Sequence, residues 1–253
     1  MTIYPTVALA QFQPPFIMQP ASPPVAYGTS VASSDVNGDD IADVIVGSIF
    51  SSAGGAKNAG QVFVFFGGPL PHTSPDLVLQ ASNPQAEARF GWSVTTGDVN
   101  GDGTPDIIVG EPFRNRGADK YVGAAYVFFG GSPPHSQADV TLQAPSSLNA
   151  KGAFGWTIAA GDINGDGFDD VLVGAENATV AGQDEAGQAF VFEGSSSFAG
   201  VLTHIHVLQS PTAQRSGQFS LVMAVGKVNG DRFADIIIGA PGDDVGQARN
   251  SGT

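Results

Sequence analysis

Cysteine is absent from this chain of 253 residues, and basic residues are scarce, with 10 Lys and Arg against 24 Asp and Glu. Without cysteine there is no disulfide, no thiolate metal site and no cysteine nucleophile. The formal net charge of −14 argues against nucleic acid as a partner, because nucleic-acid binding depends on cationic contacts with phosphate. It argues equally against docking on anionic membranes. Direct membrane insertion is not expected either, since no apolar run approaches the roughly 20 residues that span a bilayer.

Helical periodicity is also missing, whereas turn-forming residues are abundant. No segment sustains the period of an amphipathic helix. The 34 Gly and 17 Pro separate many short apolar segments, and hydrophobic residues make up 42% of the chain. That share is enough for a folded core, so the composition predicts an all-β protein of many short strands.

One motif runs through the chain four times. Each copy begins with an aromatic residue, usually followed by Gly, and ends with an apolar run closed by Gly. The copies span residues 27–47, 90–110, 154–174 and 219–239, and their first loop positions are spaced by 63, 64 and 65 residues. Units repeated in this way bury their apolar faces against one another. The repeat therefore predicts one continuous array.

Each unit is expected to hold four short strands. The first follows the aromatic residue and Gly, and the second is the apolar run, whose β-branched residues favour strand over helix. The third strand is rich in aromatic residues and the fourth is shorter. The expected third and fourth strands lie at 62–66 and 77–80, at 125–129 and 140–143, and at 189–192 and 207–209. Repeated four-stranded units predict a β-propeller.

The propeller is expected to be one domain over 1–253, with half blades at 1–20 and 213–253 and whole blades at about 21–83, 84–146 and 147–212. Residues 7–10 and 16–19 match the third and fourth strands, so each end of the chain holds half a blade. If the halves pair, the ring closes with four blades. If they do not, the chain is part of a larger propeller, such as one of seven blades, and has unpaired edges. We expect the larger propeller, because the fourth copy stops before its third strand.

An acidic loop joins the first and second strands of each unit. In three units, oxygen-bearing side chains recur at positions 1, 3, 5 and 9 of a nine-residue loop, and a backbone carbonyl at position 7 can complete the shell. Hard oxygen donors without His or Cys favour Ca²⁺, which takes about 6–8 such ligands. The predicted calcium ligands are Asp35, Asn37, Asp39, Ile41 and Asp43 in the first loop, Asp98, Asn100, Asp102, Thr104 and Asp106 in the second, and Asp162, Asn164, Asp166, Phe168 and Asp170 in the third.

A turn without metal is the alternative interpretation of such a loop. Asp, Asn and Gly form tight turns in which the side chains accept hydrogen bonds from nearby backbone. An EF-hand is excluded, because its twelfth position is a bidentate Glu and the corresponding residues here are Val46, Val109 and Val173. Three loops with one spacing favour calcium bound in a β-hairpin loop.

The fourth loop departs from this pattern. Lys227 replaces the first carboxylate, and Arg232 stands where the second and third loops have Gly. The ammonium group of Lys227 is expected to pair with Asp231 and Asp235, supplying the positive charge that a cation supplies elsewhere. The sequence therefore predicts three calcium sites and a degenerate fourth loop.

Together these elements resemble the FG-GAP repeat of integrin α-subunit propellers. The resemblance rests on the aromatic-Gly pairs, the Asp-x-Asn-x-Asp-Gly-x-x-Asp loops and the run Ile238-Gly239-Ala240-Pro241, and it covers about residues 16–253. It implies a calcium-stabilised propeller, usually seven-bladed, that acts in adhesion or ligand recognition outside the cell or at its surface. No signal peptide is evident, since residues 1–16 lack a cationic segment.

The sequence predicts a non-catalytic protein that recognises a protein or glycan ligand. No nucleophile-elbow sequence accompanies the repeats. One alternative is a carbohydrate-binding lectin that uses aromatic residues such as Trp92 and Trp156. Another is an accessory domain of a secreted hydrolase. Arg114, Arg116 and Lys120 form the one basic loop of the chain.

Overall fold

Every described segment of the chain is strand, turn or irregular loop. The computed structural model describes residues 26–68, 74–148, 150–202 and 206–244. Within these ranges there are 15 strands and no helix, and hence no helix that could cross a membrane. The prediction of an all-β protein is confirmed.

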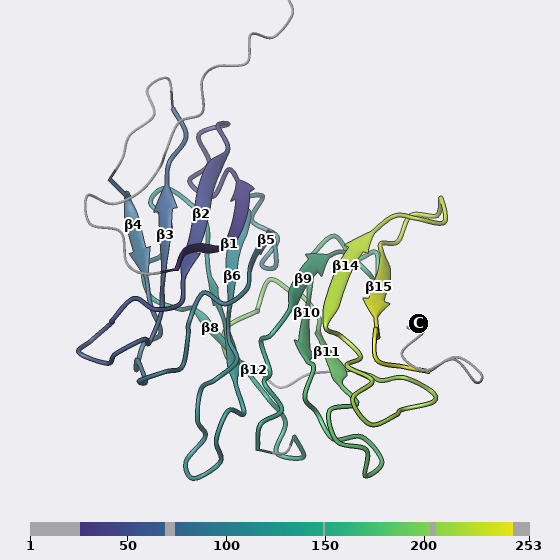
Figure 1. Cartoon of the computed structure of the whole chain (residues 1–253). Coiled ribbons are helices and arrows are strands. Elements are labelled where there is room, and N and C mark those ends of the chain that lie inside the picture. The colour runs from purple at the N-terminus through teal and green to yellow at the C-terminus, as the bar shows by residue number, and fades with distance from the viewer. Residues whose placement is uncertain (1–25, 69–73, 149, 203–205, 245–253) are drawn as a thin grey trace, which may run out of the picture.

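The strands form sheets that follow one another in the order of the chain (Figure 1). Each of the first three blades has four antiparallel strands, and a fifth strand joins the sheet of the second blade in parallel. The first blade holds β1 (Tyr27–Ser34), β2 (Asp43–Ser48), β3 (Gln61–Phe65) and β4 (Leu77–Leu79), and the second holds β5 (Val94–Gly97), β6 (Asp106–Glu111), β7 (Ala124–Phe128) and β8 (Val140–Gln143). The third holds β9 (Ile158–Gly161), β10 (Asp170–Ala175), β11 (Gln188–Phe192) and β13 (His206–Leu208), and a fourth sheet consists of β14 (Val222–Gly226) and β15 (Asp235–Gly239).

One strand, β12 (Gly200–Leu202), was not predicted from the sequence. It follows β11 of the third blade but pairs in parallel with β8 of the second, with Gly200 opposite Val140. Backbone hydrogen bonds thereby link two neighbouring blades. The strands expected at 7–10 and 16–19 lie outside the described residues, and the division of the chain into blades and half blades stays a prediction.

The hydrophobic cores lie between the blades. Every residue of β6 is buried, because this strand packs on both of its faces. Ile107 and Val109 share a cluster with Ile45 of the first blade, whereas Ile108 shares a cluster with Val171 of the third. Alternate residues of a strand point to opposite faces of its sheet. A continuous apolar run is therefore what a strand between two apolar layers requires.

The repeated glycines lie where neighbouring blades touch. Gly47, the penultimate residue of β2, lies against the backbone of Gly91, and a β-carbon on Gly47 would overlap the carbonyl oxygen of Gly91. Ser30 of β1 donates a hydrogen bond to that same carbonyl, with an Oγ to O distance of 2.7 Å. Gly110 and Gly155 repeat the close contact between the second and third blades. Close approach of two backbones explains the Gly that closes each apolar run.

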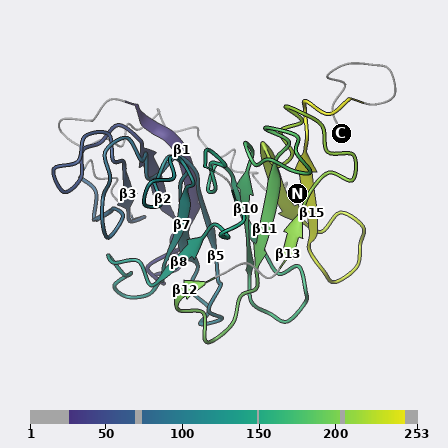
Figure 2. The same cartoon turned by 90° about the horizontal axis from the view of Figure 1, so that it is seen from below.

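The blades converge on their first strands, as in a β-propeller. β1 lies beside β5, β5 beside β9 and β9 beside β14, and Figures 1 and 2 show the resulting arc. The fourth sheet packs one face on the third blade. On its other face Ile237 is 47% exposed, whereas its counterparts Ile45, Ile108 and Leu172 in the first three blades are 0% exposed. The difference shows that each blade is buried by the one that follows it.

Candidate functional site

The predicted ligand loops gather at one end of the blades. They join the first strand of each blade to the second, and we call loops 35–42, 98–105, 162–169 and 227–234 the aspartate rim. Because the strands are antiparallel, the loops from the second strand to the third lie at the other end. We call this end of the blades the opposite rim; it holds these loops, at 49–60, 112–123 and 176–187, and the connections between blades at 80–93, 144–148 and 150–157.

The carboxylate at position 1 organises each of the first three loops. Asp98 accepts hydrogen bonds from the backbone N–H of Gly101, Asp102 and Gly103, with N to O distances of 2.7, 3.1 and 2.9 Å. Asp35 and Asp162 accept the three equivalent bonds in their own loops. Each loop thus turns around its first carboxylate.

The carboxylate at position 9 ties the loop to the blade. Asp106 is fully buried and accepts hydrogen bonds from the N–H of Val99 and of Gly130, both at 2.9 Å. Burial raises the pKa of Asp106 to about 7, and the nearby carboxylates of Asp102 and Asp98 add to the rise. Burial likewise raises the pKa of the equivalent residues, Asp43 and Asp170.

The remaining predicted positions lie in the same turns. Asn100 Oδ1 accepts the N–H of Asp102, whose Oδ1 accepts the N–H of Thr104, both at 2.9 Å, and the other two loops repeat this pattern. The side chain at position 7 has a further role. Phe168 covers Gly101 of the preceding loop so closely that a β-carbon there would overlap its ring. The loops therefore also pack blade against blade.

The donor chemistry of these loops fits Ca²⁺, although the described side chains are arranged as hydrogen-bonded turns. Within the described ranges no three His, Cys, Asp or Glu side chains form a group that could hold a metal ion. The loop carboxylates accept backbone hydrogen bonds instead. A carboxylate offers about four acceptor positions, so capacity for a cation is left. All donors are oxygen, as Ca²⁺ prefers, and the like charges around Asp106 are those that a cation neutralises.

The fourth loop differs in its side-chain contacts as well as in its sequence. The predicted ion pairs of Lys227 are wrong, since no ion pair joins it to a described Asp or Glu within 4.0 Å. Instead the side-chain amide of Asn229 donates to Asp235 Oδ1 at 2.9 Å, and Arg232 lies over the ring of Phe233 at 4.7 Å. A side-chain amide thus takes the place that a backbone N–H holds on the position 9 carboxylate of the first three loops, and Lys227 stays exposed to solvent.

The opposite rim carries a cluster of aromatic residues around one arginine. The guanidinium carbon of Arg89 lies 4.6 Å from the ring centroid of Phe113, 5.3 Å from that of Phe50 and 5.8 Å from that of Trp92. The rings of Trp92 and Trp156 are 4.5 Å apart. The two tryptophans therefore pack on each other and on Phe113, and Trp92 also lies beside the cation.

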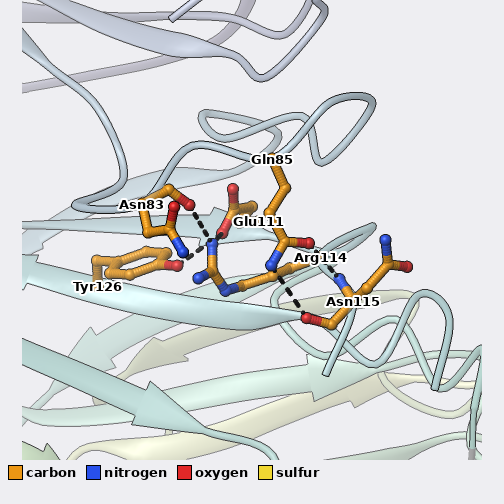
Figure 3. A network of polar contacts seen from close by, with 6 residues as sticks. All are labelled: Asn83, Gln85, Glu111, Arg114, Asn115 and Tyr126. Carbon is orange, nitrogen blue, oxygen red and sulfur yellow. Dashed lines mark hydrogen bonds and ion pairs between the residues drawn. The ribbon is translucent and has the colours of Figure 1, made fainter. Parts of the chain in front are cut away.

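The opposite rim of the second blade also holds a buried polar network that the sequence analysis missed (Figure 3). Glu111 Oε2 accepts hydrogen bonds from Tyr126 Oη at 2.6 Å and from Arg114 Nη1 at 3.1 Å. Arg114 Nη1 also donates to the carbonyl of Asn83 at 3.0 Å. Burial raises the pKa of Glu111, against the lowering effect of Arg114. The signal in the sequence was a Glu where the other copies have Ser or Ala.

The basic loop is held by these and further contacts. Arg116 donates to the carbonyls of Ala144, Pro145 and Leu148 at 3.1, 3.1 and 3.2 Å, so its side chain clamps the segment after β8. Lys120 is exposed. The three basic residues of this loop thus face different surroundings.

The third blade has its own buried acid on this rim. Glu176 is 4% exposed, and burial raises its pKa to about 7, with a further contribution from Glu185. The amide of Asn177 donates to Glu176 Oε1 at 3.4 Å and lowers the pKa slightly. The opposite rim therefore differs from one blade to the next.

Comparisons with known proteins agree with this architecture. The FG-GAP repeat matches the chain three times, at residues 27–65, 90–128 and 154–192, which are the first three strands of each of the three complete blades. Among solved structures, the exotype rhamnogalacturonan lyase YesX aligns with 83% of this chain and 38% of its own, at a TM-score of 0.50 and 14% identity. That likeness concerns the fold.

Two groups of proteins are found among the curated relatives. The chain is 34% identical over 182 residues to phosphatidylinositol-glycan-specific phospholipase D of Bos taurus, which covers 69% of this chain and 21% of the relative. It is 31% identical over 227 residues to integrin alpha-5 of Xenopus laevis, covering 86% of this chain and 20% of the relative. The chain thus spans about a fifth of the length of these relatives.

Proposed function

The chain is an FG-GAP repeat protein related to integrin α subunits, and we propose that it is a calcium-stabilised β-propeller that recognises a protein or glycan ligand without catalysing a reaction. The observation that carries the proposal is the threefold recurrence of one loop geometry. In each loop the carboxylates at positions 1, 5 and 9 each accept a hydrogen bond from a backbone N–H of that same loop. Such a repeated acidic site serves the scaffold rather than one active centre.

Calcium has a structural role in this proposal. The cation is held by the oxygen atoms at positions 1, 3, 5, 7 and 9 of the first three loops, and it supplies positive charge among clustered carboxylates. An ion that binds the folded chain and not the unfolded chain stabilises folding, and the stabilisation grows with the logarithm of the ratio of free ion to dissociation constant. Each site adds about 2.7 kcal/mol when free calcium exceeds the dissociation constant a hundredfold.

Calcium titration and thermal melting test the proposal together. The protein is stripped with EDTA, returned to buffer and titrated with CaCl₂ by isothermal calorimetry, and its melting temperature is measured with and without EDTA. We expect three sites and a lower melting temperature in EDTA. An unchanged melt would disprove the structural role of calcium, and four equivalent sites would disprove the assignment of the fourth loop.

We assign ligand recognition to the opposite rim, and we place the protein outside the cell or at its surface. The aspartate rim repeats one geometry, whereas the opposite rim carries varied aromatic and arginine side chains, the types that interfaces favour. The integrin relatives favour a place outside the cell or at its surface. Localising an epitope-tagged chain on intact and permeabilised cells tests this, and labelling only after permeabilisation contradicts it.

The second candidate function is that of an accessory domain of a hydrolase. The identity of 34% to a phosphatidylinositol-glycan-specific phospholipase D favours it. In that case the propeller positions a catalytic domain on its substrate. Sizing the native gene product and assaying it for phospholipase activity separates the two candidates, because a recognition protein alone shows no hydrolysis.

A further inference from the structure

The second blade differs from its neighbours at four positions that lie together on the opposite rim. Two of these positions are the last residue of the second strand and the residue three places after it. They are Ser48 and Ser51 in the first blade, Glu111 and Arg114 in the second, and Ala175 and Ala178 in the third. The third strand has Phe63, Tyr126 and Phe190 at one matching position, and Gln61, Ala124 and Gln188 at another. Three polar substitutions and one loss of a long side chain thus coincide in one blade.

The loss of the long side chain opens space in the second blade. In the first blade Gln61 donates to Gln80 at 3.5 Å, and in the third Gln188 donates to Gln209 at 3.1 Å. The counterpart of Gln80 in the second blade is Gln143, which lies opposite Ala124. Alanine cannot supply the missing amide. The glutamine at this position has a glutamine partner in the first and third blades. In the second blade the corresponding residue, Gln143, lines a hollow instead.

The hollow has the size and lining of a small ligand site. Its volume is about 330 Å³, at the lower end of the range for ligand pockets. Hydroxyl, carboxamide and guanidinium groups surround it, and together they offer both donors and acceptors. The polar residues that line it include Ser82, Arg114, Asn115, Tyr126, Thr141 and Gln143.

The buried network holds one wall of this hollow in place. Arg114 is fixed by Glu111 and by the carbonyl of Asn83. Beside it the side-chain amide of Gln85 donates to the backbone carbonyl of Asn115 at 3.2 Å and accepts the backbone N–H of Asn115 at 2.9 Å (Figure 3). Glu111 is 0% exposed, and its Oε1 has no hydrogen-bond partner among the described residues. A buried ion pair is weak evidence for stability, because desolvation opposes it. The Ser and Ala pairs of the other blades show that the fold does not need it.

The charge balance of the hollow favours an uncharged ligand. The guanidinium of Arg114 is paired with Glu111, and that of Arg116 is held by three backbone carbonyls and lies 3.8 Å from Asp119. Neither arginine is left as an open anion site. A compact ligand rich in hydroxyl groups matches donors and acceptors that carry little net charge.

We propose that the hollow of the second blade binds one neutral sugar residue of a glycan, with Gln143, Thr141, Asn115 and Arg114 as its hydrogen-bonding groups. Glu111 and Tyr126 act as positioning residues for Arg114. The inference rests on the proposed recognition role and gives it a ligand class and a place.

The test uses the calcium-loaded chain and free monosaccharides. Saturation-transfer difference NMR is recorded with a panel of common neutral hexoses, 6-deoxyhexoses and N-acetylhexosamines, and the best binder is titrated by calorimetry. Gln143→Ala is expected to weaken binding about tenfold, which is the effect of losing about one hydrogen bond. Gln80→Ala is the matched control in the first blade and is expected to leave the affinity unchanged.

A second variant guards against simple misfolding. Glu111→Ser, Arg114→Ser and Tyr126→Phe together give the second blade the residues of the first, an arrangement that this fold already accommodates. This variant is expected to keep its calcium sites and melting temperature and to lose sugar binding.

Two results would overturn the inference. Sugar binding that survives both Gln143→Ala and the triple variant places the sugar elsewhere. Silence of the calcium-loaded chain toward every sugar refutes the sugar site, whereas the calcium-dependent melt is measured separately and decides the proposed function on its own.

Discussion

The two rims of the blades differ in how much they vary from one blade to the next. On the aspartate rim, Asp35, Asp98 and Asp162 each accept three backbone hydrogen bonds in the same order. On the opposite rim, matching positions hold a Ser pair, a Glu–Arg pair or an Ala pair. Repetition marks the part that every blade needs in order to fold. Variation marks the part that is available for binding, because the scaffold tolerates change there.

Removal of the position 9 carboxylate is expected to have the largest effect on stability. Asp106→Ala leaves the buried N–H groups of Val99 and Gly130 without their acceptor, and we expect a loss of about 3 kcal/mol in the free energy of unfolding. Asp235→Ala in the fourth, more exposed loop is expected to lose about 1 kcal/mol. Urea denaturation in excess EDTA measures both without a contribution from calcium. Equal losses would contradict the special role of the first three loops.

The position 5 carboxylate tests the calcium part of the same rim. Asp102→Ala removes one site and is expected to cost about 2.7 kcal/mol at a hundredfold excess of calcium over its dissociation constant. Asp231→Ala, in the loop of Lys227, is expected to show no calcium-dependent loss. Melting curves at several calcium concentrations decide the matter, and a calcium-dependent loss in Asp231→Ala would show that the fourth loop binds the ion.

The buried acid of the third blade predicts a pH dependence on the opposite rim. Burial raises the pKa of Glu176 from 4.5 to about 7, so the folded chain holds this proton more tightly than the unfolded chain. Its stabilising contribution is fully present below pH 4.5 and is lost as the pH rises through about 7. Between pH 5 and 7 the wild type is expected to lose about 2 kcal/mol relative to Glu176→Gln. Parallel pH dependences of the two proteins would refute this.

A backbone substitution gives the smallest expected effect. Asp40 adopts a left-handed φ of 65°, and Gly103 and Gly167 take the same kind of conformation at this loop position, with φ of 90° and 93°. Asp40→Gly is expected to stabilise the chain by about 1 kcal/mol, because glycine adopts this conformation without strain. Arg232→Gly, at the same position of the fourth loop, is expected to bring no gain, since Arg232 has no positive φ. A destabilised Asp40→Gly in thermal melts would count against this account.

Much of the fold could be predicted because the same pattern of strands and loops recurs in each copy of the repeat. The apolar runs at 106–110 and 170–174 are buried strands on both faces, and the aromatic third strands lie within a residue of their expected places. β12 could not be predicted, because its pairing with β8 depends on the neighbouring blade and not on a local pattern. The pairing of Lys227 was wrong for a related reason. Spacing places charges in one loop but does not decide which rotamer and which partner prevail.

The sequence by itself determined the all-β architecture, the repeat and the position of every aspartate in its loop, because these follow from local pattern and period. Only the tertiary structure decided what those aspartates contact, with both oxygens of Asp106 taken by backbone N–H groups from two different loops. The tertiary structure also assembled the polar hollow of the second blade. Its walls come from β7, β8 and three connecting segments, and no single segment reveals that their differences from the neighbouring blades meet at one place.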